Sequence, residues 1–173
     1  NYVINHYCRQ IGLEFDRDGE IARRGAICRP LLDELNGMEF YHQSGPKSLG
    51  REWVETQVYP MLERYGLSVE DKLRTFYEHA AFQIFRIINA NPSSAGNGKL
   101  LITGGGAFNK FLVERIEALC PCQIVIPGRQ IIEYKEALIF AFLGALYMAD
   151  EPGCLASVTG ASMDNIGGML FKV

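Results

Sequence analysis

The chain has 173 residues, 48% of them hydrophobic and 21% charged, which is the composition of an ordinary globular protein. A chain of this length buries roughly 70% of the surface that its unfolded form exposes, so it can build a sizeable core. The formal net charge of -3 argues against a broad cationic surface for nucleic acid. The longest apolar run, residues 137–149, is shorter than the roughly 20 residues that cross a bilayer, so we expect no membrane segment.

The five cysteines form neither a dense disulfide framework nor the paired spacing of a zinc site. We therefore expect a reducing, cytoplasmic compartment. The first residue is Asn1 rather than methionine, and no signal segment opens the sequence. We expect the chain to be a piece of a longer protein.

Residues 1–64 have helix-like apolar spacing interrupted by Gly12, Gly37 and a turn at residues 44–46, which predicts several short helices. The clearest helix follows, because apolar residues from Leu73 to Ile88 recur at every third or fourth position. Ser68 is placed to cap its start. The sequence after this helix, up to residue 98, predicts an exposed loop.

Residues 99–148 predict an alternation of strands and helices. Residues 99–103 and 123–126 are expected as short strands, the first of them buried, residues 109–119 as a helix, and residues 133–148 as a long, largely buried helix. Strand–helix–strand order is typical of crossovers in a parallel sheet, so we predict an α/β fold weighted towards helix. Two strands make a poor parallel sheet, so others have either been missed or lie upstream of Asn1.

The segment Thr103–Asn109, which reads Thr-Gly-Gly-Gly-Ala-Phe-Asn, predicts a strand-to-helix turn built for close backbone approach to a ligand. Glycine has no Cβ to hold a ligand away, the amides at the start of a helix favour an anion, and Asn109 can cap the first turn. The alternative is a turn needed only for packing. Because one glycine would serve that purpose, three in a row favour a ligand, most simply a nucleotide. The segment is neither a dehydrogenase GxGxxG fingerprint nor a P-loop.

Two further places carry charged residues of interest. Lys47 and Arg51 stand one helical turn apart and could clamp an anionic substrate or a partner loop. Composition alone favours the alternative, a solvated helix start with Ser48 as its cap and Glu52 as an ordinary ion-pair partner. Glu136 stands where the sequence becomes almost wholly apolar, so it is either a first-turn residue favoured by the helix dipole or a group aimed into a site.

No metal site is predicted. A calcium loop counted from Asp16 would need glycine at its sixth position and glutamate at its twelfth, where the chain has Ile21 and Ile27. The three histidines, His6, His42 and His79, have no cysteine or carboxylate partners at metal-ligand spacing. We expect them to be structural or surface residues.

Four motifs span nearly the whole chain: PKSLGRE at residues 46–52, LITGGGAFN at 101–109, KEALIFAFLG at 135–144 and SVTGAS at 157–162. Together and in this order, they resemble the C-terminal half of the anhydro-N-acetylmuramic acid kinase family. The order of the four makes the match specific, whereas no single motif would.

The resemblance implies membership of the sugar kinase, heat-shock and actin superfamily, whose two ribonuclease-H-like lobes close over ATP. The chain would then be the C-terminal part of one actin-like ATPase lobe, a single domain over residues 1–173. Residues 1–95 would be mainly helical and residues 96–173 the nucleotide side. The family hydrolyses the 1,6-anhydro bond of anhydro-N-acetylmuramic acid and phosphorylates oxygen 6, using ATP and Mg²⁺, in peptidoglycan recycling. Such phosphoryl transfer depends on positioning and charge stabilisation.

The resemblance also assigns roles to residues. The nucleotide-side turn would comprise Gly104, Gly105, Gly106, Ala107 and Asn109. The substrate or cleft segment would comprise Lys47, Ser48, Gly50 and Arg51. Glu136 matches a glutamate that heads the last long helix near the cleft, and it is our candidate catalytic residue. Leu49 replaces a threonine of the family and Phe108 a common arginine, which puts polar contacts at those positions in doubt.

The family's N-terminal lobe, and the aspartate that activates the attacking water, would precede Asn1, so this chain alone is expected to be inactive. Its partners would be an amino sugar and its own N-terminal lobe, and an open sheet edge could support a homodimer. Two alternatives stay open: a kinase for another amino sugar such as N-acetylglucosamine, and a non-catalytic relative that binds a nucleotide or a partner protein.

Overall fold

The computed structural model describes residues 1–43, 48–90 and 98–171, and the chain divides into two compact units, Asn1–Pro127 and Gly128–Val173. The elements of the first unit are α1 (Tyr2–Gln10), α2 (Glu20–Arg24), α3 (Arg29–Asn36), α4 (Glu39–His42), α5 (Arg51–Trp53), α6 (Tyr59–Arg64), α7 (Val69–Ala90), β1 (Lys99–Leu101), α8 (Lys110–Leu119) and β2 (Gln123–Val125). The second unit holds α9 (Arg129–Met148) and α10 (Ala156–Thr159). This helix-rich fold with a short parallel sheet is of the α/β class.

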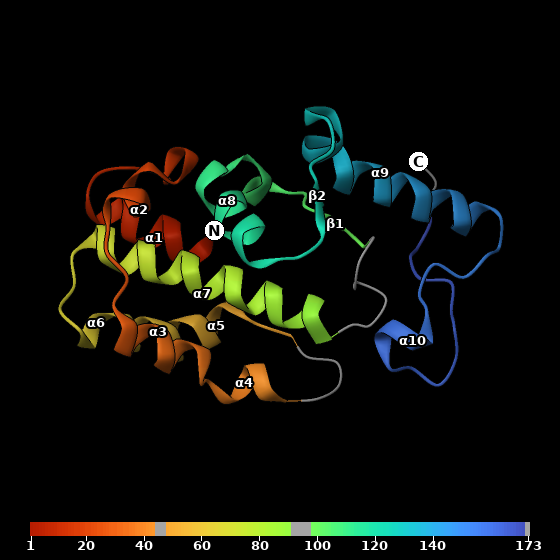
Figure 1. Cartoon of the computed structure of the whole chain (residues 1–173). Helices are drawn as coiled ribbons and strands as arrows, with labels where there is room; N and C mark the ends of the chain where they lie inside the picture. Colours follow the sequence, from red (N-terminus) through yellow and green to blue (C-terminus); the bar gives the residue numbers. More distant parts are fainter. Residues whose placement is uncertain (44–47, 91–97, 172–173) are drawn as a thin grey trace. The chain divides into compact units, whose positions relative to one another are not determined.

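The central helix of the first unit is α7, and in the view of Figure 1 the helices α1, α2 and α8 are drawn above it and α3 to α6 below it. Its fully buried hydrophobic residues Leu73, Tyr77 and Ala81 are spaced by four and therefore form one stripe. The amide of Asp71 donates a hydrogen bond to the Ser68 hydroxyl at 3.1 Å. Both the helix and its predicted cap are confirmed.

Short helices fill residues 1–64 of the described chain, as predicted. Each of α1, α3 and α6 is held to α7 by apolar side chains, because none is long enough to be stable alone. The fully buried members of this core from the three short helices are Tyr7, Cys8, Leu31, Leu35 and Leu62.

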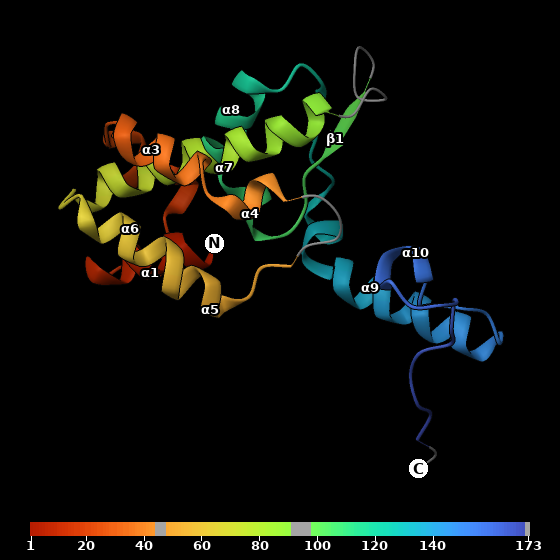
Figure 2. The same cartoon turned by 90° about the horizontal axis from the view of Figure 1, so that it is seen from below.

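A π-helical segment, Val54–Val58, joins α5 to α6 into one helical stretch. The amide of Tyr59 donates to the carbonyl of Val54, five residues earlier. Pro60 has no amide to continue the ordinary four-residue pattern, which accounts for the wider turn at this place. The stretch lies beside α1 (Figure 2), where His6 stacks on Tyr59 with ring centroids 4.2 Å apart.

The sheet pairs β1 with β2 in parallel, with Leu100 opposite Ile124, as the strand–helix–strand order predicted. A second core cluster joins the sheet to α7 and α8 through Ala81 and Ile116. The expectation that the first strand is buried is wrong, because Leu101 is 60% exposed. Helices cover one face of this two-stranded sheet, and side chains alternate between the faces of a strand.

The second unit consists of α9 and a C-terminal segment that folds back through a bridge between Cys154 and Asn165. The helix begins at Arg129, four residues earlier than predicted, because the Gly128 carbonyl accepts hydrogen bonds from the amides of Ile131 and Ile132. The prediction of a largely buried helix is wrong. Ile132 alone in α9 is buried within the described structure, and Phe140 is 72% exposed.

The reason is that apolar residues occur nearly all round α9, whereas the C-terminal segment covers only part of it. Leu143 and Leu146 face Gly153, where a Cβ would come within 3.1 Å of the Leu143 Cδ2 atom. Among the described residues, no helix combines the length and the apolar character that a membrane span requires.

Candidate functional site

The glycine turn connects β1 to α8, which confirms the predicted strand-to-helix turn. Gly104 has φ 77° and ψ -179°, a conformation that is essentially restricted to glycine. A 3₁₀ helix, Gly105–Phe108, follows, and Asn109 then begins α8. The amides that open this turn are therefore those of Gly105 and Gly106, which have no partner within their own 3₁₀ helix.

The three glycines have different reasons to be glycine. Gly104 needs its positive φ. A Cβ on Gly105 would lie 3.0 Å from the Asn1 Nδ2 atom, which is a tight but adjustable contact. A Cβ on Gly106 would lie 3.8 Å from the Leu112 Cδ2 atom, an ordinary distance. Neither the backbone nor the packing of the described chain therefore requires glycine at position 106.

Asn109 organises the turn through three hydrogen bonds. Its Oδ1 atom accepts from the Leu112 amide at 2.9 Å, which is the predicted cap of α8. Its Nδ2 atom donates to the Tyr77 hydroxyl at 2.6 Å and to the Asp16 carbonyl at 3.2 Å. Because both donors of the amide are used, Asn109 positions the turn in this structure and has no N–H left for a ligand.

Asp16 and Tyr77 form the buried base of the site. The Asp16 carboxylate accepts hydrogen bonds from the amides of Ile21 at 2.8 Å and Ala22 at 3.2 Å, so it holds the start of α2. Tyr77 is 0% exposed. Burial first, and then the Asp16 carboxylate, raise the pKa of the Tyr77 hydroxyl above its ordinary value, so the hydroxyl stays protonated.

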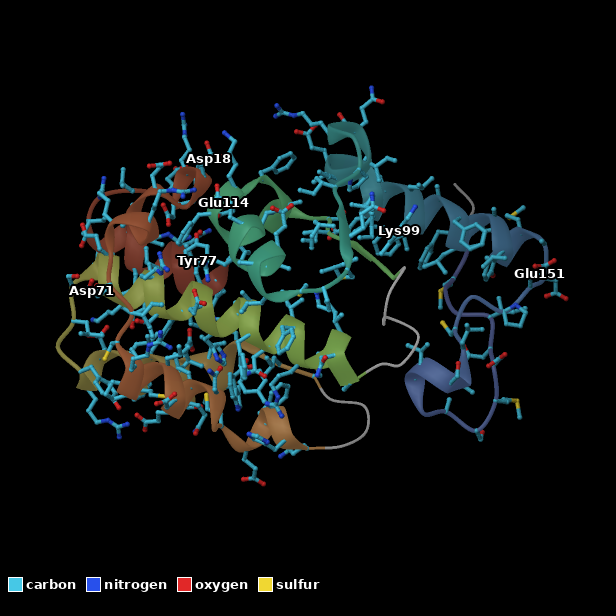
Figure 3. All side chains as sticks on the ribbon, in the orientation of Figure 1. Asp18, Asp71, Tyr77, Lys99, Glu114 and Glu151 are labelled. Carbon is cyan, nitrogen blue, oxygen red and sulfur yellow. The ribbon has the colours of Figure 1, made fainter. Side chains whose placement is uncertain are left out.

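A cavity of about 380 Å³ opens beside the turn, a volume within the range of small-molecule sites. Tyr77 on α7 and Asp18, from the turn before α2, are two of its lining residues and are labelled in Figure 3. The remaining wall combines asparagines, a second aspartate, a glycine, and apolar and aromatic side chains: Asn1, Ile4, Asn5, Phe15, Asp16, Gly105, Phe108 and Asn109. The arrangement suits a ligand with both a flat apolar part and polar groups.

Arg51 lies in the same unit as the glycine turn, at the start of α5. Its Nε atom is 2.7 Å from the Glu55 Oε1 atom, so Arg51 forms its ion pair with Glu55. The alternative of a solvated helix start named Glu52 as the ion-pair partner instead. That alternative is also wrong about the cap, since Gly50 occupies the capping position without a side-chain bond. Ser48 is exposed, and Lys47 lies outside the described residues.

Glu136 belongs to the second unit and is exposed. The interpretation as a first-turn residue is wrong, because α9 begins at Arg129 and Glu136 lies two turns inside it. Its candidate catalytic role therefore rests on the family motif alone.

His79 is a structural residue, as expected, and it is 2% exposed. Its Nδ1 atom is 2.7 Å from the Asn36 Oδ1 atom and its Nε2 atom is 3.1 Å from the Tyr41 hydroxyl. With the Asn36 oxygen as acceptor, Nδ1 carries the proton and Nε2 accepts from Tyr41. Burial lowers the pKa of His79 to about 4, so the ring is neutral at pH 7.

Sequence reasoning missed Asp16 and Tyr77. From sequence alone, Asp16 is considered only as part of a calcium loop, although an aspartate four residues before Glu20 also fits a helix start. Tyr77 was assigned to the apolar face of its helix, where no local signal separates a core tyrosine from one that bonds to a site. Within the described chain, no group of three or more histidine, cysteine or acidic residues could hold a metal ion.

The sequence matches one family model along its whole length. That model is described as anhydro-N-acetylmuramic acid kinase, and residues 1–173 match it. The match includes both the glycine turn and the α5 segment. The chain therefore belongs to the anhydro-N-acetylmuramic acid kinase family.

Proposed function

We propose that the protein hydrolyses the 1,6-anhydro bond of anhydro-N-acetylmuramic acid and phosphorylates oxygen 6 of the sugar, in the peptidoglycan recycling of the cytoplasm. The observation that carries the proposal is the family match across residues 1–173. In this reaction water adds to carbon 1, the bond from carbon 1 to the bridging oxygen breaks, and that oxygen receives the phosphoryl group. The product is N-acetylmuramic acid 6-phosphate.

ATP would bind at the glycine turn, through Gly104, Gly105, Gly106 and Ala107. Three features support this placement. The amides of Gly105 and Gly106 open a 3₁₀ helix, the space beside Gly106 could hold a Cβ but holds none, and a cavity of about 380 Å³ adjoins the turn. ATP supplies the transferred phosphoryl group, and the chain's own residues hold and orient it. Asn109 would act indirectly, by fixing the turn to Tyr77 and Asp16.

Mg²⁺ is the expected companion of ATP in this chemistry. Since the described residues offer no metal cluster, ligands for Mg²⁺ would come from ATP itself and from the N-terminal lobe that we propose for the complete protein. That lobe would also carry the aspartate that activates water. The complete protein would then be an actin-like kinase, with Lys47, Ser48 and Arg51 at the substrate side and Glu136 near the cleft.

The test is to give the full-length protein ATP, Mg²⁺ and anhydro-N-acetylmuramic acid, and to follow the products by mass spectrometry. The expected product has the mass of the substrate plus one water and one phosphoryl group. N-acetylglucosamine, supplied in parallel, distinguishes a kinase for another amino sugar. Absence of the 6-phosphate, with N-acetylglucosamine phosphorylated instead, would overturn the proposal, and no turnover of any sugar would favour a non-catalytic binding protein.

A further inference from the structure

Glu55 holds two side chains at once. Its Oε1 atom accepts a hydrogen bond from the Tyr2 hydroxyl at 2.7 Å and another from the Arg51 Nε atom at 2.7 Å. The bond from Arg51 and then the bond from Tyr2 lower the pKa of the Glu55 carboxyl below its usual value, so it stays ionised. Tyr2 thus joins Arg51 and Glu55, which follow it far along the chain, in one cluster.

The ring of Tyr2 also packs against the guanidinium of Arg51. The Arg51 guanidinium carbon lies 5.4 Å from the centroid of the Tyr2 ring, a cation–π distance. The Tyr2 ring in turn stacks against Tyr59, with centroids 6.2 Å apart. The guanidinium is therefore fixed both in place and in plane, although Arg51 is an exposed residue whose side chain is 70% accessible.

The cluster adjoins the cavity at the glycine turn. Asn1, Ile4 and Asn5 line that cavity from the first turn of α1, and Tyr2 belongs to the same turn. Tyr2, whose ring lies against the guanidinium, directly follows the lining residue Asn1 in the chain. The cluster and the cavity both lie within the first unit.

Much of the Arg51 guanidinium stays accessible to a ligand. Glu55 bonds to its Nε atom, and 70% of the side chain remains exposed. Paired guanidinium N–H groups match the two oxygens of a carboxylate. Exposed ion pairs contribute little to stability, so Arg51 can be replaced without unfolding the protein.

We propose that Arg51 recognises the carboxylate of the substrate, with Glu55 and Tyr2 as the residues that position it. The inference rests on the proposed function, because the carboxylate is the lactic acid group that makes the sugar a muramic acid. N-acetylglucosamine has no such group. Arg51 is then the residue that selects the acid over uncharged amino sugars.

The same arrangement of residue types occurs a second time and provides a matched control. Arg64 pairs with Glu34, Glu34 accepts a hydrogen bond from the Tyr65 hydroxyl at 2.9 Å, and the Arg64 guanidinium carbon lies 5.8 Å from the Tyr65 ring centroid. Neither cluster itself lines the cavity at the glycine turn. Tyr2 directly follows the lining residue Asn1, whereas no sequence neighbour of Arg64, Glu34 or Tyr65 lines the cavity. A purely structural role would make the two clusters equivalent.

The experiment compares kcat/KM of the full-length enzyme for anhydro-N-acetylmuramic acid and for its carboxamide, in which the carboxylate is neutral. Wild type should prefer the acid. Arg51→Gln should lower kcat/KM for the acid on the order of 10- to 100-fold and leave that for the amide nearly unchanged. Glu55→Gln and Tyr2→Phe should reduce the preference by smaller factors, and Arg64→Gln should not alter it.

Each outcome decides the matter. An equal loss for acid and amide in Arg51→Gln, or a wild type without preference, would overturn the inference while leaving the proposed function in place. If wild type converts neither compound, the proposed function fails and the inference fails with it. Circular dichroism of each variant separates misfolding from altered recognition, and Glu55→Gln tests the positioning without removing the guanidinium.

Discussion

The side-chain amide of Asn109 donates a hydrogen bond to the Tyr77 hydroxyl across 2.6 Å, so the residue that caps α8 is also tied to the centre of α7. The second N–H of the same amide reaches the Asp16 carbonyl, on the segment that leads into α2. One side chain therefore sets the glycine turn against two other elements. The geometry of the proposed nucleotide site depends on it.

Replacement of Asn109 by alanine should destabilise the protein by about 2 kcal/mol, because it removes a helix cap and leaves the buried Asp16 carbonyl and Tyr77 hydroxyl without their donor. Urea unfolding followed by circular dichroism measures the change. Asn109→Ser retains an oxygen for the cap and should recover part of the loss. Equal stability of the alanine variant and wild type would contradict the hydrogen-bonding role.

Gly104 and Gly106 should respond differently to alanine. Gly104→Ala places a Cβ on a backbone with φ 77° and should cost about 1–3 kcal/mol. Gly106→Ala meets only ordinary contacts, so its unfolding midpoint should match that of wild type. If ATP lies against this turn, the Gly106 variant should still raise the Kd for ATP severalfold in calorimetry. Unchanged ATP binding by a folded Gly106→Ala would argue against nucleotide at this position.

His79 should make the protein sensitive to mild acid. Its pKa is about 4 when folded and 6.5 in the reference state, so the unfolded chain binds more protons between these values. Stability is present above pH 6.5 and is lost as the pH falls towards 4, by roughly 2 kcal/mol between pH 7 and pH 5. Urea unfolding at the two pH values measures this loss.

The control for this prediction is His79→Gln, which cannot titrate. Carboxylates elsewhere titrate equally in both proteins, so the difference between wild type and the variant isolates the histidine. The variant should be less stable than wild type at pH 7 and should lose less on acidification. Parallel losses in the two proteins would mean that His79 is not the sensor.

The 173-residue chain alone should self-associate. Its two-stranded sheet pairs each strand on one side only among the described residues, and Leu101 exposes an apolar side chain on β1. Sedimentation velocity should show dimers or larger species, and Leu101→Lys should reduce them. A single species of 19.4 kDa over a wide concentration range would contradict the prediction.

The sequence predicted those elements that local chemistry decides. The spacing of Leu73, Tyr77 and Ala81 defined α7, Ser68 defined its start, and Asn109 was correctly expected to cap α8. The turn at residues 104–106 was equally readable, because glycine in series has few other uses. In each case the deciding interaction lies within a few residues of the chain.

Contacts between distant residues were beyond such reasoning. No residue near Glu55 in sequence indicates that the Tyr2 hydroxyl will donate a hydrogen bond to its carboxylate. The hydrogen bond from Asn109 to Tyr77 likewise joins two different helices. The burial of α9 was overestimated for a related reason. An apolar sequence indicates which side chains a helix can bury when another element packs against it. In the second unit, the C-terminal segment packs against only part of α9.

The π-helical turn before α6 makes the register of the α5 segment sensitive to the number of residues. A wide turn is an α-helix with one residue added, and each residue of an α-helix rotates the chain by about 100°. Deletion of Gln57 from Val54–Val58 would rotate Arg51 and Glu55 together relative to Tyr59, and so carry both away from Tyr2. The length of this turn therefore fixes which side chains of the α5 segment meet the Tyr2 ring.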